Sequence, residues 1–335
     1  MKFKSIFITG GAGYCGSRIV PRLLDKGYKV TVYDIMYFGY DFLPKNNPNL
    51  NIIIGDIRDT KKIGESCRGH DVFISLACIS NDTSFNLDEA LSTTINLDAF
   101  EPMVKAAKSS GIKRFMYASS SSVYGVSDKK DVKENHPLVP LTLYNKYKGL
   151  CEPILKNYSD NNFEGVIFRP ATVCGYAPRL RLDLSVNILT NFAINKNKIV
   201  VFGGKQLRPN LHIEDYCGVV ECLINAPSDK IKDQIFNVGY QNLSIAEIAK
   251  KVKKVVENYF SDKKKIEIET TPSDDNRSYH INSDKIKNVL GFVPKLTIED
   301  AIRDLCVAFK ENKIPNSFED DFYFNLKRLK RINAK

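Results

Sequence analysis

The sequence predicts an α/β fold, a doubly wound parallel sheet that carries helices on both faces. A glycine-rich turn joins the first apolar run, residues 6–8, to a helical pattern that begins near Ser17. Short apolar runs then alternate with helical stretches as far as Ala118. This alternation is typical of βαβ units, in which consecutive strands run parallel.

The first half of the chain supplies most of the expected strands, at residues 30–34, 52–56, 71–77 and 114–118. A long helical stretch at 87–110 precedes the last of them, and Gly111 is placed to end it. From about residue 169 the chain is richer in loops, with short strands at 200–203 and 235–239. We therefore expect one domain over residues 1–168 and a smaller α/β lobe over 169–335, some of whose segments pack back on the first domain.

Composition excludes several classes of protein. The 335 residues are 43% hydrophobic and 26% charged, which is ordinary for a globular protein, and no apolar run approaches the length of a membrane span. The net charge of +10 comes from scattered lysines, so we expect a weak attraction for anionic substrates and no binding of nucleic acid. The eight cysteines form no Cys-x-x-Cys pair. They indicate free thiols in a reducing cytoplasm and no metal site.

The glycine-rich turn has the spacing of a dinucleotide-binding site. A strand, a glycine turn and a helix present backbone N–H groups and a helix N-terminus to a diphosphate. Gly10 permits the tight turn, Gly13 allows close approach, and Gly16 lets the helix pack on the strand. Asp34 ends the next apolar run, about 20 residues on, where a carboxylate binds the adenosine ribose and repels a 2′-phosphate. The sequence therefore predicts a Rossmann domain that binds NAD in preference to NADP.

A second motif suits proton transfer. Tyr144 and Lys148 are four residues apart, so on a helix they project from one face. A neighbouring ammonium and a nicotinamide cation would lower the pKa of the tyrosine and make it a usable base. The run Ser119–Ser122 follows an expected strand and can supply a hydroxyl beside Tyr144, although four serines leave the choice open. Each motif also has a purely structural interpretation. Tyr144 and Lys148 also fit an exposed pair on a helix, and the serine run also fits a loop that caps a helix.

With these motifs the chain resembles an extended short-chain dehydrogenase/reductase of the NAD-dependent nucleotide-sugar epimerase/dehydratase family, over nearly its whole length. The resemblance implies a homodimer. It implies NAD contacts at Gly10, Gly13, Tyr14, Cys15, Gly16, Asp34, Asp56, Ile57, Leu76, Ala77, Tyr144 and Lys148. It implies catalytic roles for Ser120, Tyr144 and Lys148, and contacts to a nucleotide-sugar substrate at Ser121, Phe202, Arg208 and Arg277.

Within this family the residues after Ser120 bear on the reaction. Sugar 4,6-dehydratases place acids there, whereas Ser121 and Ser122 carry hydroxyls, which favours 4-epimerases of UDP-sugars and UDP-uronic acids. The alternatives are an NDP-sugar dehydrogenase or 4-ketoreductase with net redox, a 4,6-dehydratase, and a non-catalytic dinucleotide sensor. Thr172 replaces a common asparagine, so the nucleotide and the sugar stay open. The stretch 179–183 is either a surface ion pair of Arg181 with Asp183 or a substrate contact.

Overall fold

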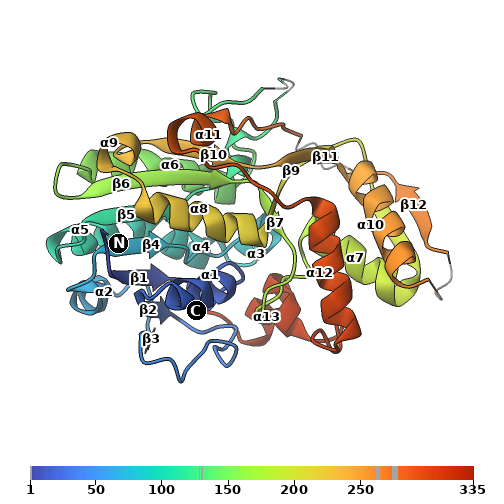
Figure 1. Ribbon diagram of the computed structural model, residues 1–335, viewed down its shortest axis with the longest axis horizontal. Coiled ribbons are helices and arrows are strands. Elements are labelled where there is room, and N and C mark those ends of the chain that lie inside the picture. The colour runs from blue at the N-terminus through green and yellow to red at the C-terminus, as the bar shows by residue number, and fades with distance from the viewer. Residues whose placement is uncertain (1, 128, 130, 262–264, 274–277) are drawn as a thin grey trace.

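The computed structural model describes residues 2–127, 129, 131–261, 265–273 and 278–335. Its main element is a sheet of seven parallel strands in the order β10-β6-β5-β4-β1-β2-β3 (Figure 1). These strands are β1 (Ser5–Thr9), β2 (Lys29–Asp34), β3 (Leu50–Ile54), β4 (Val72–Ser75), β5 (Arg114–Ala118), β6 (Glu164–Pro170) and β10 (Ile235–Val238). The strand order reverses direction at β1, so the predicted doubly wound parallel sheet is confirmed.

Helices cover both faces of this sheet because successive strand residues point to opposite sides. Ile6 and Ile8 of β1 belong to a core beneath α1 and α8, whereas Phe7 belongs to a second core beneath α2, α5 and α6. The bounds of these helices are α1 (Gly16–Asp25), α8 (Ile213–Asn225), α2 (Thr60–Cys67), α5 (Phe100–Ser109) and α6 (Leu143–Tyr158). The continuous apolar strands of the sequence are therefore buried on both faces.

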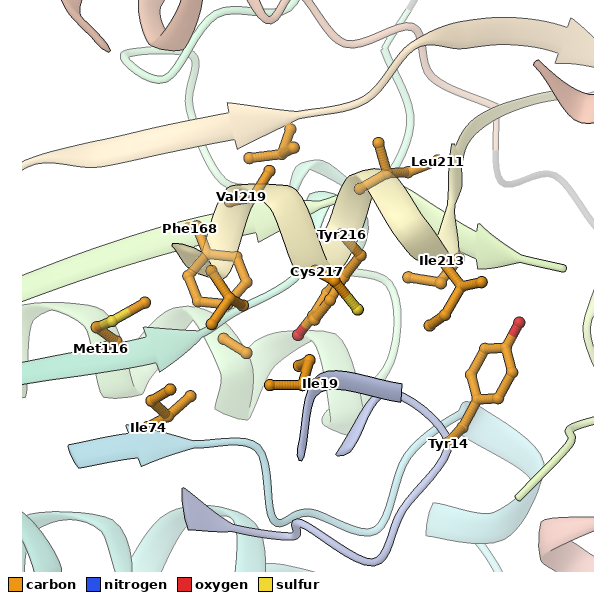
Figure 2. Packing of buried hydrophobic residues seen from close by; sticks show 14 of the residues in the cluster. Tyr14, Ile19, Ile74, Met116, Phe168, Leu211, Ile213, Tyr216, Cys217 and Val219 are labelled. Atoms are coloured by element: carbon orange, nitrogen blue, oxygen red, sulfur yellow. The ribbon is translucent and has the colours of Figure 1, made fainter. Parts of the chain in front are cut away.

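Helix α8 comes from the second half of the chain but lies on the main sheet. Figure 2 shows Tyr216 and Cys217 on this helix, with Phe168 of the sheet and Ile19 of α1 nearby in the same core. The end of the helix is held by Arg114, whose guanidinium is fully buried and donates hydrogen bonds to three carbonyl oxygens there. Strand β10 also joins the main sheet from the second half, beside β6.

Most of the other elements of the second half form a separate group, to the right of the main sheet in Figure 1. Two small sheets lie here, β11-β9-β7 and β12-β8. Their strands are β7 (Thr172–Cys174), β8 (Lys198–Phe202), β9 (Leu207–His212), β11 (Gln241–Ser244) and β12 (Glu267–Thr271). Helices α7 (Ser185–Lys196), α10 (Ile245–Tyr259) and α12 (Ile298–Lys310) pack together over a third core.

The remaining elements are short. They are α3 (Asp82–Phe85), α4 (Glu89–Thr93), the π-helix η1 (Thr94–Asp98), the 3-10 helices η2 (Ser121–Tyr124) and η3 (Asp321–Tyr323), α9 (Ser228–Ile231), α11 (Asp284–Leu290) and α13 (Asn325–Arg331). The expected helix at 87–110 is therefore wrong in one respect, since a π-helical turn interrupts it. At that turn Asn96 accepts a hydrogen bond from the Ile79 N–H and donates one to the Ile79 carbonyl. Among the described residues no helix is both long and apolar enough to cross a membrane.

Candidate functional site

A cavity of about 720 Å³ opens where the strands of the main sheet end. Ligand sites of open α/β sheets lie at this edge, beside the point where the strand order reverses. Every predicted site residue among those described lines this cavity. They are Gly10, Gly13, Tyr14, Cys15, Gly16, Asp34, Asp56, Ile57, Leu76, Ala77, Ser120, Ser121, Tyr144, Lys148, Phe202 and Arg208. Arg277 lies outside the described residues.

The glycine turn has the geometry that a dinucleotide requires. Gly10 has a φ of +76°, and a Cβ there would lie 2.5 Å from the backbone nitrogen of Ala77. A Cβ on Gly13 would come within 4 Å only of the Gly10 carbonyl oxygen, so the other side of Gly13 is open to the cavity. A Cβ on Gly16 would meet Gly11 at 2.4 Å, so this glycine packs the helix on the turn and not on β1 itself. The open side of Gly13 fits the close approach of a diphosphate.

Asp34 is the last residue of β2 and faces the same cavity. Its carboxylate accepts hydrogen bonds from the backbone N–H groups of Ala12, at 3.0 Å, and Met36, at 2.8 Å. Burial raises the pKa of Asp34, and these two N–H groups oppose that rise. A carboxylate has about four acceptor sites. Asp34 can therefore hold the glycine turn and still accept hydrogen bonds from a ribose.

The serine run follows β5, and its hydroxyls face in different directions. Ser119 donates a hydrogen bond to the buried carboxylate of Glu152 at 2.6 Å, so its hydroxyl proton already has an acceptor in the protein interior. Ser120 accepts a hydrogen bond from the backbone N–H of Ser122, and the two hydroxyls lie 2.7 Å apart. Ser122 donates to the side chain of Asn145, next to Tyr144. A hydrogen-bonded path thus runs from Ser120 to the start of α6.

Tyr144 and Lys148 lie in the first two turns of α6, which Thr142 caps at its N-terminus. The Lys148 ammonium is buried and donates to the Ala118 carbonyl oxygen at 2.8 Å, which fixes it at the end of β5. That Lys148 and a nicotinamide cation together lower the pKa of Tyr144 stays a prediction. Burial raises the pKa of the Tyr144 phenol well above its usual value, and the cation that opposes the rise is Arg181.

Arg181 and Asp183 form the ion pair considered from sequence, but the pair is largely buried in the lining of the cavity and does not lie on the surface. Arg181 Nε donates to Asp183 Oδ1 at 2.8 Å, and a second nitrogen donates to Ser80 Oγ at 3.1 Å. Burial would lower the pKa of Arg181, but Asp183 outweighs it and keeps that pKa above its usual range. Asn81 donates to the other oxygen of Asp183. The pair thus joins the polar loop after β4 to the second half of the chain beside Tyr144.

Two parts of the site were missed from sequence. Arg179 lines the cavity with its side chain almost completely buried, and Asn325 and Leu329 of α13 line it as well. The alternation of charged and apolar residues at 179–183 was a signal for a partly buried segment. No local pattern marks Asn325, because its place in the site depends on how the end of the chain folds back toward β2 (Figure 1).

Comparisons with known proteins agree with this geometry. The model of a protein family described as the NAD dependent epimerase/dehydratase family matches residues 6–239. The chain is 28% identical to a UDP-N-acetyl-alpha-D-glucosaminuronate decarboxylase of Bacillus cytotoxicus, with 92% of this chain and 98% of the relative covered. It is 25% identical to a UDP-glucose 4-epimerase of Lactobacillus helveticus, with 94% and 99% covered.

A solved structure shares the fold. The crystal structure of DesIV, a dTDP-glucose 4,6-dehydratase of Streptomyces venezuelae with NAD bound, superimposes with a TM-score of 0.81. The two proteins are 21% identical, and the match covers 92% of this chain and 98% of the other.

Proposed function

Because the chain belongs to the NAD-dependent epimerase/dehydratase family, we propose that it is a nucleotide-sugar epimerase acting on an NDP-hexose or NDP-uronic acid. The reaction proceeds through transient oxidation at C4 of the sugar. One observation carries the proposal: a single cavity joins the glycine turn and Asp34 to Ser120, Tyr144 and Lys148 and to second-lobe residues. When NAD is bound there, it supplies the acceptor and later the donor of the C4 hydride.

Tyr144 is the base that removes the proton of the 4-hydroxyl. Its deprotonation needs positive charge nearby because burial disfavours the phenolate, and Arg181 supplies such charge. Ser120 stands in the hydrogen-bond path to α6 and orients the hydroxyl of the sugar. Lys148 donates one N–H to the Ala118 carbonyl oxygen, so two further N–H donors of its ammonium are available for the nicotinamide ribose.

The acids around the cavity favour epimerisation over elimination of water. Elimination at C5 and C6 needs a carboxylic acid to protonate the departing hydroxyl. The two residues after Ser120 are Ser121 and Ser122, which carry no carboxyl group. The acids that line the described cavity are Asp34, Asp56, Asp82 and Asp183, and each accepts hydrogen bonds from the protein.

The second lobe supplies the substrate contacts. Arg208 lies on β9 and lines the cavity, where a guanidinium suits the substrate diphosphate. Phe202 ends β8 with 62% of its surface exposed, so its ring is available to the nucleotide base. We also propose a homodimer, as the family resemblance implies, in a reducing cytoplasm, as the eight free cysteines indicate. Light scattering of the purified protein tests the dimer.

The test of the proposed reaction is incubation with UDP-, GDP-, dTDP- and CDP-sugars, followed by proton NMR and by absorbance at the NADH band. We expect a C4 epimer without free NADH, and no product from Tyr144→Phe. Stoichiometric NADH with a keto product would mean a dehydrogenase. A 4-keto-6-deoxy product would mean a dehydratase, and loss of C6 from a uronic acid would mean a decarboxylase. No turnover of any sugar, together with no effect of Tyr144→Phe, would favour a dinucleotide sensor.

A further inference from the structure

The guanidinium of Arg179 is buried in the cavity wall, and no carboxylate from the part of the chain that the structure describes is bonded to it. The side chain is 1% exposed, and its Nε has no hydrogen-bond partner among the described residues. One terminal nitrogen donates to the side-chain oxygen of Asn325 at 2.5 Å. Burying a charge that is not fully paired costs free energy. A buried arginine of this kind in a ligand cavity is therefore a candidate contact for an anionic group of the ligand.

The contacts of Arg179 indicate which part of the cavity it lies in. Its backbone N–H donates to Ser17 Oγ at 3.2 Å, and Ser17 is in the first turn of α1. The N-terminus of α1, a helix of 10 residues, and the glycine turn present their N–H groups at this point. The charged groups that act on Arg179 are Arg181, Asp183 and Asp34, and Asp34 lies at the ribose end of the predicted cofactor site. The guanidinium therefore lies on the cofactor side of the cavity.

Two contacts hold the guanidinium plane in place. It stacks on the ring of Phe38, with its central carbon 3.6 Å from the ring centroid, and it is bonded to Asn325 of α13. Burial lowers the pKa of Arg179 to about 9, and the neighbouring charge of Arg181 adds to this fall. Burial and the like charge both disfavour the charged guanidinium, and an anionic ligand group beside it would favour the charged form.

We propose that Arg179 binds the diphosphate of the dinucleotide cofactor, opposite the glycine turn. Arg179, from the second half of the chain, and the N-terminus of α1 then contact the diphosphate from two sides. Asn325 ties this arginine to α13, so the end of the chain closes over the bound diphosphate. The inference depends on NAD binding, which belongs to the proposed function, but not on which reaction follows.

The test compares binding by nucleotide-free wild type, Arg179→Met and Arg179→Lys. Calorimetric titration with NAD and ADP-ribose measures diphosphate binding, and NMR titration with adenosine measures binding without phosphate. We expect Arg179→Met to weaken NAD and ADP-ribose by about 10- to 100-fold, the value of a lost charge-assisted contact. Adenosine should bind as to wild type, and Arg179→Lys should lose less than the methionine variant. Arg22→Met is the control, because Arg22 pairs with Glu214 and Glu221 away from the cavity and should leave all three affinities unchanged.

Thermal unfolding without ligand separates binding from a structural role. A guanidinium that lacks a carboxylate partner should be replaceable by methionine with little loss of melting temperature. A large fall in the melting temperature of the empty Arg179→Met protein would overturn the inference. So would unchanged NAD affinity. If a parallel titration with UDP then showed a loss, that result would assign the arginine to the substrate diphosphate. If wild type itself bound neither NAD nor ADP-ribose, the proposed function would fail together with the inference.

Discussion

Replacing Glu152 with glutamine should strongly destabilise the protein, because Glu152 anchors a buried polar network behind the serine run. Its carboxylate accepts from Ser119 Oγ at 2.6 Å and from two nitrogens of Arg169, at 2.9 and 2.5 Å. Both charged side chains are only 3% exposed. Arg169 also donates to the hydroxyl of Tyr124 at 2.6 Å, in the stretch that follows the serines.

The size of the effect follows from the charge that is left behind. Glutamine keeps the shape and one acceptor oxygen, but it leaves the Arg169 guanidinium buried without a counter-charge. Removing one member of a buried ion pair costs about 3–5 kcal/mol. That is a large part of the roughly 5–15 kcal/mol by which native proteins are stable. We therefore expect a clear fall in the urea midpoint of Glu152→Gln, followed by far-ultraviolet circular dichroism.

Two further variants make the assay specific. Glu101→Gln removes an exposed pair with Lys105 and should leave the midpoint nearly unchanged, since exposed pairs contribute little. The double variant Glu152→Gln with Arg169→Met removes the unpaired charge and should recover part of the stability. A midpoint for Glu152→Gln equal to that of Glu101→Gln would refute the reasoning.

Three shorter predictions concern the site and its support. Gly10→Ala should cost at least about 2 kcal/mol and abolish NAD binding in calorimetry, because of its positive φ and the backbone that its Cβ would strike. Gly39→Ala, with φ +70° but nothing within 4 Å, should cost only about 1 kcal/mol and leave NAD binding intact. Asp71 has its pKa held to about 2 although burial raises it, because a lysine ammonium and two backbone N–H groups bond it. It therefore stabilises the fold above about pH 4 and loses this effect as the pH falls toward 2, so Asp71→Asn should cost about 1 kcal/mol at pH 7 and flatten the acid limb of urea denaturation. Arg181→Gln should raise the pKa of Tyr144 and move the rise of the pH–rate profile to higher pH, whereas an unchanged profile would remove Arg181 from the proton transfer.

Much of the fold could be predicted because its signals are local. Alternating apolar runs and helical patterns identify strands and helices, and the short-range rules of βαβ connection place them in one parallel sheet. The glycine turn is local too, since Gly10 and Gly13 act through their own backbone geometry. The π-helical turn was not predictable, because the hydrogen bonds of Asn96 there go to Ile79, in a different segment.

The sequence by itself determined which segments meet at the carboxyl edge of the sheet, and so that the glycine turn and the Tyr144 set line one cavity. The tertiary structure alone decided which charges surround them. Arg179 and Arg181 come from a loop far along the chain, and Asn325 from its last helix. Burial, which raises the pKa of Tyr144 and lowers that of Arg179, depends on how these distant segments exclude water. Local patterns record which residues share an element, but the electrostatic environment of a site is a property of the packed whole.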